Sequence, residues 1–552
     1  MAYDLLIKNG RIVDGSGLPS IWGDVGVADG RIVEVGKLGG PAGRIIDAQG
    51  QAIAPGFIDN HCHYDAQALW DPICTWTCYH GTTTVVNGNC SLGLAPARPG
   101  ERDDLVSMLS RVEAIPIESL RAGIEGSWET IPEYLDVLDR RLGVNVGALI
   151  GFSAVRRYVM GEDAYTEQAT PEQIDQMKAI IREGVAAGAI GLSFERNPTH
   201  MDLEGRLTPC NVASSDELLA VAEALGEVGA GSIQFNGFDR MELKEGLLSR
   251  MSRATGRPLV TTIGGDPFDE KLAHLERTRR EGARLVPMLT PFIDDPQRWT
   301  VLTSNSFDRL PHWVAITIKP LEERKRAFKE SAARAGLRED TLTNVQRPSW
   351  DTTAVAATVR PQNRHLVGKS ITEIAREQGK EPFDAFFDLV LDEDLETMFA
   401  QRTGNGPEVK GPALTSPYTM PGQADSGAHV TRRCDSHVST HLLSYWVREL
   451  QAMTLEEAVR KLTFVPASAF GLHDRGLIRP GLAADLVVFD PDTVSPGELD
   501  QIADFPAGAV RMRRLPRGIE HTIVNGEVLI EEGEHTGAYP GRVARSSAYQ
   551  AR

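Results

Sequence analysis

The chain has 552 residues, which is too long for one ordinary domain but compatible with a barrel core of about 250 residues or more. Its 41% hydrophobic and 24% charged residues are typical of a globular protein. The formal net charge of −18 argues against binding to nucleic acid or to anionic membranes, because both select basic surfaces.

Cysteine usage and the chain start indicate the compartment. Six cysteines in 552 residues do not form a disulfide scaffold. The chain enters a strand pattern at once, without a signal-peptide pattern, and holds no run near the about 18 apolar residues of a spanning helix. We therefore expect a reduced, cytoplasmic protein that acts on a small molecule, without nucleic-acid or membrane partners, and that forms a homo-oligomer.

Residues 1–54 alternate short apolar runs with turns, which predicts a small antiparallel sheet. The same pattern returns in residues 476–535. Because these strands need partners, we expect both segments to build one β-sandwich. Residues 536–552 are expected to form a polar tail.

A pair of histidines follows the first apolar run after the N-terminal sheet. Phe57 and Ile58 lead into His61 and His63. On a strand, residues two apart point to the same face, so both imidazoles would converge while Cys62 faces the other way. Imidazole is the commonest side-chain metal ligand, and the pair needs only further donors to hold zinc.

Residues 55–475 alternate short apolar strands with helical stretches. Such alternation predicts a parallel sheet covered by helices, and seven or eight units predict a closed (β/α)8 barrel. The predicted strands include 146–150, 189–194, 233–235, 259–263 and 284–289, and the predicted helices include 171–187, 214–228, 240–254 and 267–281.

The alternation breaks between residues 291 and 420, where a charged helix over 319–335 stands among polar loops. A connection of this length inside a barrel is either a lid over the site or a surface elaboration. Asp425 follows it, where the eighth strand should end. Its carboxylate would face the same open end as His61 and His63, although an aspartate before Ser426-Gly427 also suits a turn.

Five segments in order along the chain together resemble one known family. They are Asp4–Gly15, Pro55–Asp65, Gly81–Cys90, Asp425–His429 and Ala483–Asp490. They are similar to the amidohydrolase superfamily, and within it to the N-acyl-D-amino-acid deacylase (D-aminoacylase) branch.

The resemblance implies a distorted (β/α)8 TIM barrel with its site at the carboxyl ends of the strands, and a flanking β-sandwich. It implies a hydrolase of carbon–nitrogen bonds other than peptide bonds, acting on an N-acyl amino acid. His61 and His63 would bind zinc. Asp425 would bind zinc and also serve as general base and then acid. Cys90 would be a thiolate ligand, although a small buried thiol is the alternative.

The chain departs from this family at two strands. The branch supplies one histidine from the fifth strand and one from the sixth, but residues 231–236 and 259–264 contain none. Residues 193–195 also lack a lysine that could be carbamylated to bridge two metals. We therefore expect one zinc ion per chain.

Four further residues are expected to bind a substrate that carries a carboxylate. Arg196 and His200 follow the fourth strand, and Arg196 would clamp the carboxylate, although surface charge is an equally simple explanation. Arg156 follows the third strand. His429 lies close enough in sequence to Asp425 to orient it or to stabilise an oxyanion.

Two other functions are compatible with the same residues. The first is hydrolysis of a cyclic imide, lactam or lactone, because substrate class changes when metal ligands change. The second is a non-catalytic assembly protein with an amidohydrolase fold. Such proteins generally lose the histidine pair, which this chain keeps.

Overall fold

The computed structural model describes residues 2–237, 242–264, 267–293, 297–302, 307–343, 349–401 and 406–550. The predicted helix from Arg240 begins outside these residues, and its described part forms helices from Leu243 onward. Among the described residues, no helix combines the length and apolar character that crossing a bilayer requires.

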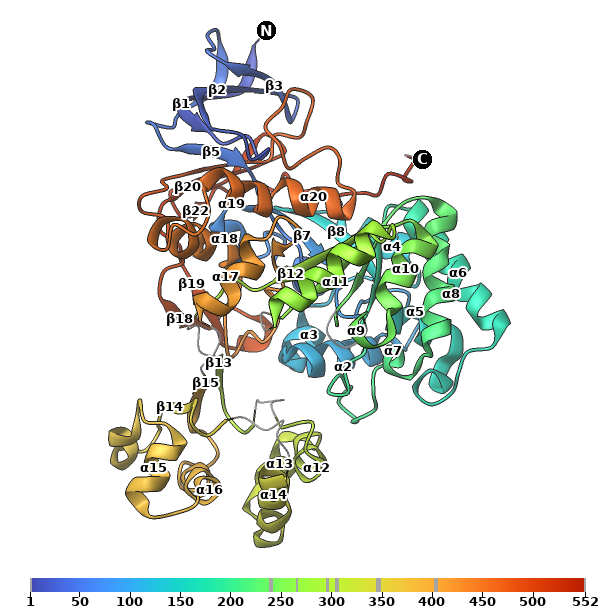
Figure 1. The fold of residues 1–552 in the computed structure, drawn as a ribbon, viewed down its shortest axis with the longest axis vertical. Coiled ribbons are helices and arrows are strands. Elements are labelled where there is room, and N and C mark those ends of the chain that lie inside the picture. The colour runs from blue at the N-terminus through green and yellow to red at the C-terminus, as the bar shows by residue number, and fades with distance from the viewer. Residues whose placement is uncertain are drawn as a thin grey trace.

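Eight parallel strands form the central barrel (Figure 1). Their neighbours run in the order β16-β12-β11-β10-β9-β8-β7-β6. The strands are β6 (Phe57–Asp59), β7 (Thr82–Asn87), β8 (Asn145–Gly151), β9 (Gly191–Phe194), β10 (Ser232–Phe235), β11 (Leu259–Thr262), β12 (Leu285–Leu289) and β16 (Met420–Pro421). The short strands are buried throughout or nearly so, which is why their sequences are apolar rather than alternating.

The barrel closes where the segments after β16 and β6 run side by side. Asn60 Nδ2 donates to the carbonyl of Pro421 at 2.8 Å. Beyond it, the His63 N–H donates to the Ser426 carbonyl at 2.7 Å, and Cys62 pairs with Ser426 as in a parallel sheet. The predicted distorted (β/α)8 barrel is confirmed.

Helices connect the barrel strands and cover their outer face (Figure 1). The longest, α6, starts with a capping box in which Thr170 accepts from the Gln173 N–H, and Pro171 occupies its first position. The helices of this part are α1 (Gln67–Trp70), α2 (Arg102–Glu113), α3 (Ile117–Gly123), α4 (Ile131–Leu138), α5 (Phe152–Met160), α6 (Pro171–Ala186), α7 (Pro209–Val212), α8 (Ser215–Val228), α9 (Leu243–Glu245), α10 (Leu247–Thr255), α11 (Phe268–Arg280), α17 (Pro407–Thr415), α18 (Val438–His441), α19 (Leu455–Leu462) and α20 (Phe464–Phe470).

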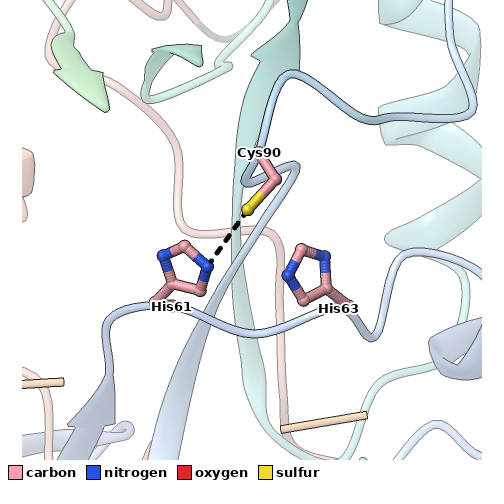
Figure 2. Close-up of side chains that lie close together, drawn as sticks. All are labelled: His61, His63 and Cys90. Atoms are coloured by element: carbon pink, nitrogen blue, oxygen red, sulfur yellow. Dashed lines mark hydrogen bonds between the residues drawn. The ribbon is translucent and has the colours of Figure 1, made fainter. Parts of the chain in front are cut away.

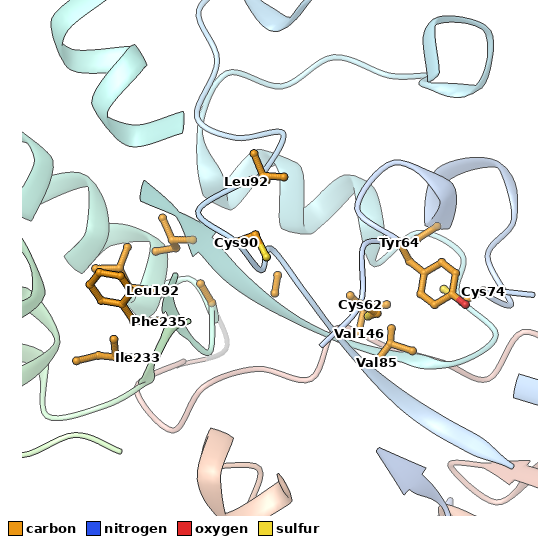
Figure 3. Close-up of a cluster of buried hydrophobic side chains, with 14 of the residues drawn as sticks. Cys62, Tyr64, Cys74, Val85, Cys90, Leu92, Val146, Leu192, Ile233 and Phe235 are labelled. Atoms are coloured by element: carbon orange, nitrogen blue, oxygen red, sulfur yellow. The ribbon is translucent and has the colours of Figure 1, made fainter. Parts of the chain in front are cut away.

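The largest hydrophobic cluster fills the barrel and the space under its helices. Figure 3 shows the part of this cluster around Val85, Val146 and Leu192, which come from neighbouring strands. Cys90 lies in the same cluster, just beyond the end of β7. Cys90, a possible metal ligand, is therefore held by a rigid and densely packed core.

Both ends of the chain contribute to one nine-stranded sheet, as predicted, with a hydrophobic core of its own. Its strands are β1 (Tyr3–Ile12), β2 (Ile21–Ala28), β3 (Arg31–Gly36), β4 (Ala42–Asp47), β5 (Ala52–Pro55), β17 (Leu486–Phe489), β20 (Ile519–Val524), β21 (Glu527–Glu531) and β22 (Glu534–His535). The sheet is mixed rather than purely antiparallel, because β1 pairs in parallel with β4 and β5. Strands β18 (Leu499–Ile502) and β19 (Arg511–Arg514) form a separate pair.

The expected polar tail is an anchored segment over residues 541–546. The Gly541 N–H donates to Leu142, and the Ala544 N–H donates to Val146, each at 2.8 Å. Val543 is buried. These contacts join the tail to the amino-terminal end of β8, opposite the end that carries the histidines.

The predicted insertion contains a lobe with its own core. A three-stranded antiparallel sheet, β13 (Gln297–Trp299), β14 (Thr353–Ala357) and β15 (Met398–Gln401), joins it to the barrel (Figure 1). Its helices are α12 (Pro311–Thr317), α13 (Leu321–Lys329), α14 (Ser331–Thr343), α15 (Ile371–Gln378) and α16 (Pro382–Asp392). The predicted helix over 319–335 is interrupted at Glu330, and α17 and β16 belong to the barrel.

Candidate metal centre

His61 and His63 lie just past the end of β6, at the carboxyl end of the barrel strands. Cys62 between them forms a parallel bridge with Ser426, and the two rings lie with their centroids 5.4 Å apart (Figure 2). Both side chains are fully buried. Cys62 between them points the other way and contacts the carbonyl of Val86 and the side chain of Asn87.

Cys90 faces the histidine pair from the loop after β7. Its backbone has a φ of +56°, a left-handed conformation that turns the chain sharply after the strand. Its Sγ lies 3.4 Å from His61 Nε2 (Figure 2). The potential ligand atoms of His61, His63 and Cys90 all lie within 4.8 Å of one another.

Asp425 completes this group from the segment after β16. Its Oδ1 lies 3.2 Å from His61 Nε2 and 3.8 Å from His63 Nε2. Its other oxygen, Oδ2, accepts a hydrogen bond from Arg433 at 2.7 Å. Arg433, which the sequence analysis did not identify, therefore leaves Oδ1 directed at the histidines.

Burial and neighbouring charges set the protonation of these groups. Burial raises the pKa of Asp425, but the hydrogen bond with His61 and the charge of Arg433 outweigh it and hold that pKa well below its usual range. Burial, together with His61, lowers the pKa of His63 to about 3, so its ring is neutral and able to bind a metal. Burial and the nearby carboxylates Glu113 and Glu195 raise the pKa of the Cys90 thiol.

Side-chain amides occupy the positions beside Cys90 on the fifth strand and just after it. Gln234 Oε1 accepts from the Cys90 N–H at 3.2 Å, and Gln234 Nε2 donates to Asn236 Oδ1 at 2.7 Å. Asn236 Nδ2 contacts Cys90 Sγ at 3.5 Å. These amides form a hydrogen-bonded wall beside Cys90.

Glu113, at the end of α2, was not predicted and lies on the other side of His63. Its Oε1 is 3.5 Å from His63 Nε2, and its side chain is 4% exposed. Burial and the charge of Asp425 raise its pKa well above the usual value. No local pattern could have identified it, because a glutamate closing an amphipathic helix is ordinary.

His429 lies next to this group, as expected from its closeness to Asp425. Its Nε2 is 3.8 Å from Glu113 Oε2, and its Nδ1 contacts Arg432 Nη2 at 2.6 Å. Burial and the charges of Arg433 and Arg432 lower its pKa, which keeps the ring neutral. The ring is thus fixed between a carboxylate and a guanidinium.

Arg196 and His200 lie on the loop after β9. Arg196 donates to Ser215 Oγ at 3.0 Å and to the Ala213 carbonyl, and it is half-buried. His200 is near enough to His63 to contribute to the lowering of its pKa. Of the two residues, only His200 is among the groups that shift the pKa of His63.

Arg156 does not have the position expected of a substrate ligand. It is fully buried, its Nε donates to Glu217 Oε1 at 2.8 Å, and its other nitrogens bond to the carbonyls of Ala164 and Glu167. Its guanidinium is thus paired inside the protein, where it links α5 to α8.

The donor set fits a divalent metal. His63 Nε2 is buried and has no hydrogen-bond partner among the described residues, which is costly unless a ligand satisfies it. Tetrahedral zinc with bonds of about 2.0–2.3 Å has ligand–ligand edges of about 3.3–3.7 Å. The contacts of His61 Nε2 with Cys90 Sγ and Asp425 Oδ1, at 3.4 and 3.2 Å, have nearly these lengths.

Comparisons with known proteins agree with this geometry. The amidohydrolase family matches residues 44–530. A D-aminoacylase of Alcaligenes xylosoxydans xylosoxydans is 28% identical over 99% of this chain and 98% of its own. An N-acyl-D-glutamate deacylase of Bordetella bronchiseptica, solved with zinc and a phosphonate inhibitor, superimposes with a TM-score of 0.68 at 26% identity, over 99% and 100% of the chains. A D-aminoacylase structure with a binuclear metal centre gives 0.69 at 25% identity, over 98% and 100%.

Proposed function

This chain belongs to the amidohydrolase family, and from that premise we propose that it is a metal-dependent deacylase of N-acyl amino acids. It is a hydrolase of carbon–nitrogen bonds other than peptide bonds, like the deacylases that it resembles. The observation that carries the proposal is the convergence of His61, His63, Cys90 and Asp425 at the carboxyl end of the barrel.

These four residues would hold one zinc ion. A divalent metal of this kind supplies Lewis acidity, which acidifies water and polarises a carbonyl group. His63 offers a neutral ring nitrogen, His61 offers a second ring nitrogen beside it, and Asp425 offers an ionised oxygen. Cys90 would bind as a thiolate, since metal binding releases the thiol proton despite its raised pKa.

Asp425 is the proposed general base. Its carboxylate accepts a proton from the attacking water and then returns it to the leaving nitrogen, so that the amide C–N bond breaks and a carboxylate and an amine form. Arg433 holds one oxygen and directs the other toward the histidines.

A carboxylate on the substrate would meet a positive charge at the rim. We propose Arg196 for this contact, with His200 and His429 as further contacts of the substrate. Support comes from the loop after β9, which carries Arg196 and His200 and places His200 near His63.

The test is activity across N-acetyl-D-amino acids, N-acetyl-L-amino acids and cyclic amides such as hydantoins, with metal content measured on the same preparation. We expect hydrolysis of N-acetyl amino acids, with one metal per chain. Asp425→Asn should lower kcat about 100-fold or more, because general-base catalysis typically contributes that much.

Three results would argue against the proposal. Activity confined to cyclic amides would favour the alternative substrate class. Metal content near zero in an inactive protein would favour a non-catalytic role. A content near two metals per chain would contradict the one-metal assignment. The deacylase activity would still be decided by the activity assay on the same preparation.

A further inference from the structure

Glu113 enters the site from outside the barrel strands. It is the last residue of α2, and Ala114 follows with a φ of +48°, so the helix ends there. Its carbonyl accepts the His429 N–H at 2.5 Å, which fixes its backbone beside the site. We propose that Glu113 is a further ligand of the metal, which the family resemblance does not assign.

The donors form a continuous arc in which Glu113 is the last member. Cys90, His61, Asp425, His63 and Glu113 follow one another with donor–donor separations of 3.4, 3.2, 3.8 and 3.5 Å. Each is within a few tenths of an ångström of a zinc ligand–ligand edge. An ion bound beside His63 Nε2 would therefore be within reach of the Glu113 carboxylate.

The contacts of Glu113 also favour a ligand at its carboxylate. Its Oε1 is buried and has no hydrogen-bond partner within the described ranges. A buried polar atom without a partner is costly unless a ligand satisfies it. Arg433, a nearby cation, already pairs with Asp425 and Asp435. A metal ion beside His63 would supply the partner that Glu113 Oε1 lacks among the described residues.

Glu113 lies at the other end of the arc from Cys90 and the β10 side. The wall on the β10 side carries Gln234 and Asn236, which are bonded to each other and to Cys90. A carboxylate from α2 supplies an additional donor from the opposite side. The inference deepens the proposed function and rests on it only in requiring a bound metal.

The test measures zinc affinity without substrate, by competition with a chelator, in the wild type, Glu113→Gln and Asp65→Asn. Glu113→Gln keeps the shape but not the charge, and we expect zinc affinity to fall more than about 100-fold, beyond the roughly 10–100-fold effect of residues that only orient ligands. Asp65→Asn is the control, because Asp65 is also buried but its carboxyl faces the Gly88 N–H. Asp65→Asn should change zinc affinity less than about threefold. It therefore reports the effect of removing a buried carboxylate that does not bind the metal.

A cobalt-substituted protein gives a second readout. If Glu113 is a ligand, the visible absorption bands of bound Co²⁺ shift in Glu113→Gln and in the shorter Glu113→Asp, which also serves if Glu113→Gln does not fold. Unchanged zinc affinity and an unchanged cobalt spectrum in a folded variant would overturn the inference, even if the wild type deacylates. A wild type that binds zinc through Glu113 but hydrolyses no N-acyl amino acid would overturn the proposed function alone.

Discussion

Arg156 shows how a residue with the right sequence position for a site can serve the fold instead. Its guanidinium pairs with Glu217 inside the protein. We predict that Arg156→Met lowers the free energy of unfolding by about 3–5 kcal/mol, because Glu217 is left as an unpaired buried charge. Chemical unfolding monitored by tryptophan fluorescence checks this.

The matched control is Arg156→Met combined with Glu217→Gln, which removes both charges. Its loss of stability should be smaller than that of the single variant, and KM should be unchanged in both. A raised KM at wild-type stability would return Arg156 to the substrate site.

The sequence predicted the part of the site that lies in local motifs. His61 and His63 were identified because the two-residue spacing on an extended segment fixes their common side. Asp425 and Cys90 came from motif resemblance. Glu113 and Arg433 could not be identified, because their roles arise from contacts between segments far apart in the chain.

The seam that closes the barrel is the element on which the site depends most directly. A Cβ on Gly422 would lie 2.0 Å from Asn60 Oδ1, where the two segments meet. We predict that Gly422→Ala lowers stability by about 1–3 kcal/mol through overpacking and weakens zinc binding, since His61 and Asp425 flank this seam. Thermal unfolding with and without zinc measures both effects.

Gly411→Ala is the control for this variant. Gly411 lies in α17, and an added Cβ there would only touch Trp446 at 3.6 Å. Since alanine favours a helix, this variant should be at least as stable as the wild type. Equal effects of the two substitutions would contradict a special role of the seam.

Lys461 makes the contact between α19 and the segment before β16 dependent on pH. Its ammonium donates to the carbonyls of Ser416 and Thr419, and burial lowers its pKa from 10.5 to about 8. Below pH 8 the group is charged in both folded and unfolded chains, and its burial costs the folded chain about 3 kcal/mol. This cost disappears as the pH rises from about 8 to 10.5, because the folded protein loses the proton first.

The comparison with Lys461→Met isolates this group. The melting temperature of the wild type should rise relative to that of Lys461→Met between pH 7 and pH 10. A difference that does not change with pH would show that the Lys461 pKa is not lowered by burial.

At the scale of elements, the strength of the sequence signal decided what could be predicted. The strands β8 to β12 were predicted because their apolar runs alternate with helical stretches. The eighth strand, β16, is only Met420–Pro421 and begins at the predicted end of the insertion, and two residues carry no periodicity that could have located it. The predicted helix over 319–335 is split because Glu330 leaves the helical conformation.

The segment over residues 541–546 joins the tail to the barrel. We predict that truncation after Gly537 lowers stability by on the order of 3 kcal/mol, because Val543 and Ala544 lose their burial and the backbone pairs with β8 are lost. The turnover number should stay near that of the wild type, because the site lies at the opposite end of the barrel. Differential scanning calorimetry measures the loss of stability, and steady-state kinetics measure the turnover number. An unchanged melting temperature would contradict the predicted loss of stability.

For the whole molecule, the sequence predicted the barrel, the shared small sheet and the presence of an insertion. It did not predict that the insertion has an aromatic core around Trp299, Phe307 and Trp313, because Phe386, which packs against all three, comes from a distant part of the sequence. The anchoring of the tail was also missed, since a polar sequence hides backbone pairing.

The pairing of β5 with β17 has a consequence for biosynthesis. Ala54 pairs with Val487, so the amino-terminal strands leave the ribosome long before the strand that covers them exists. At translation rates of about 5–20 residues per second, roughly 20–90 s separates the two events. During that interval the apolar edge of β5 is open to other nascent chains, so this protein should depend on chaperones while it is being made.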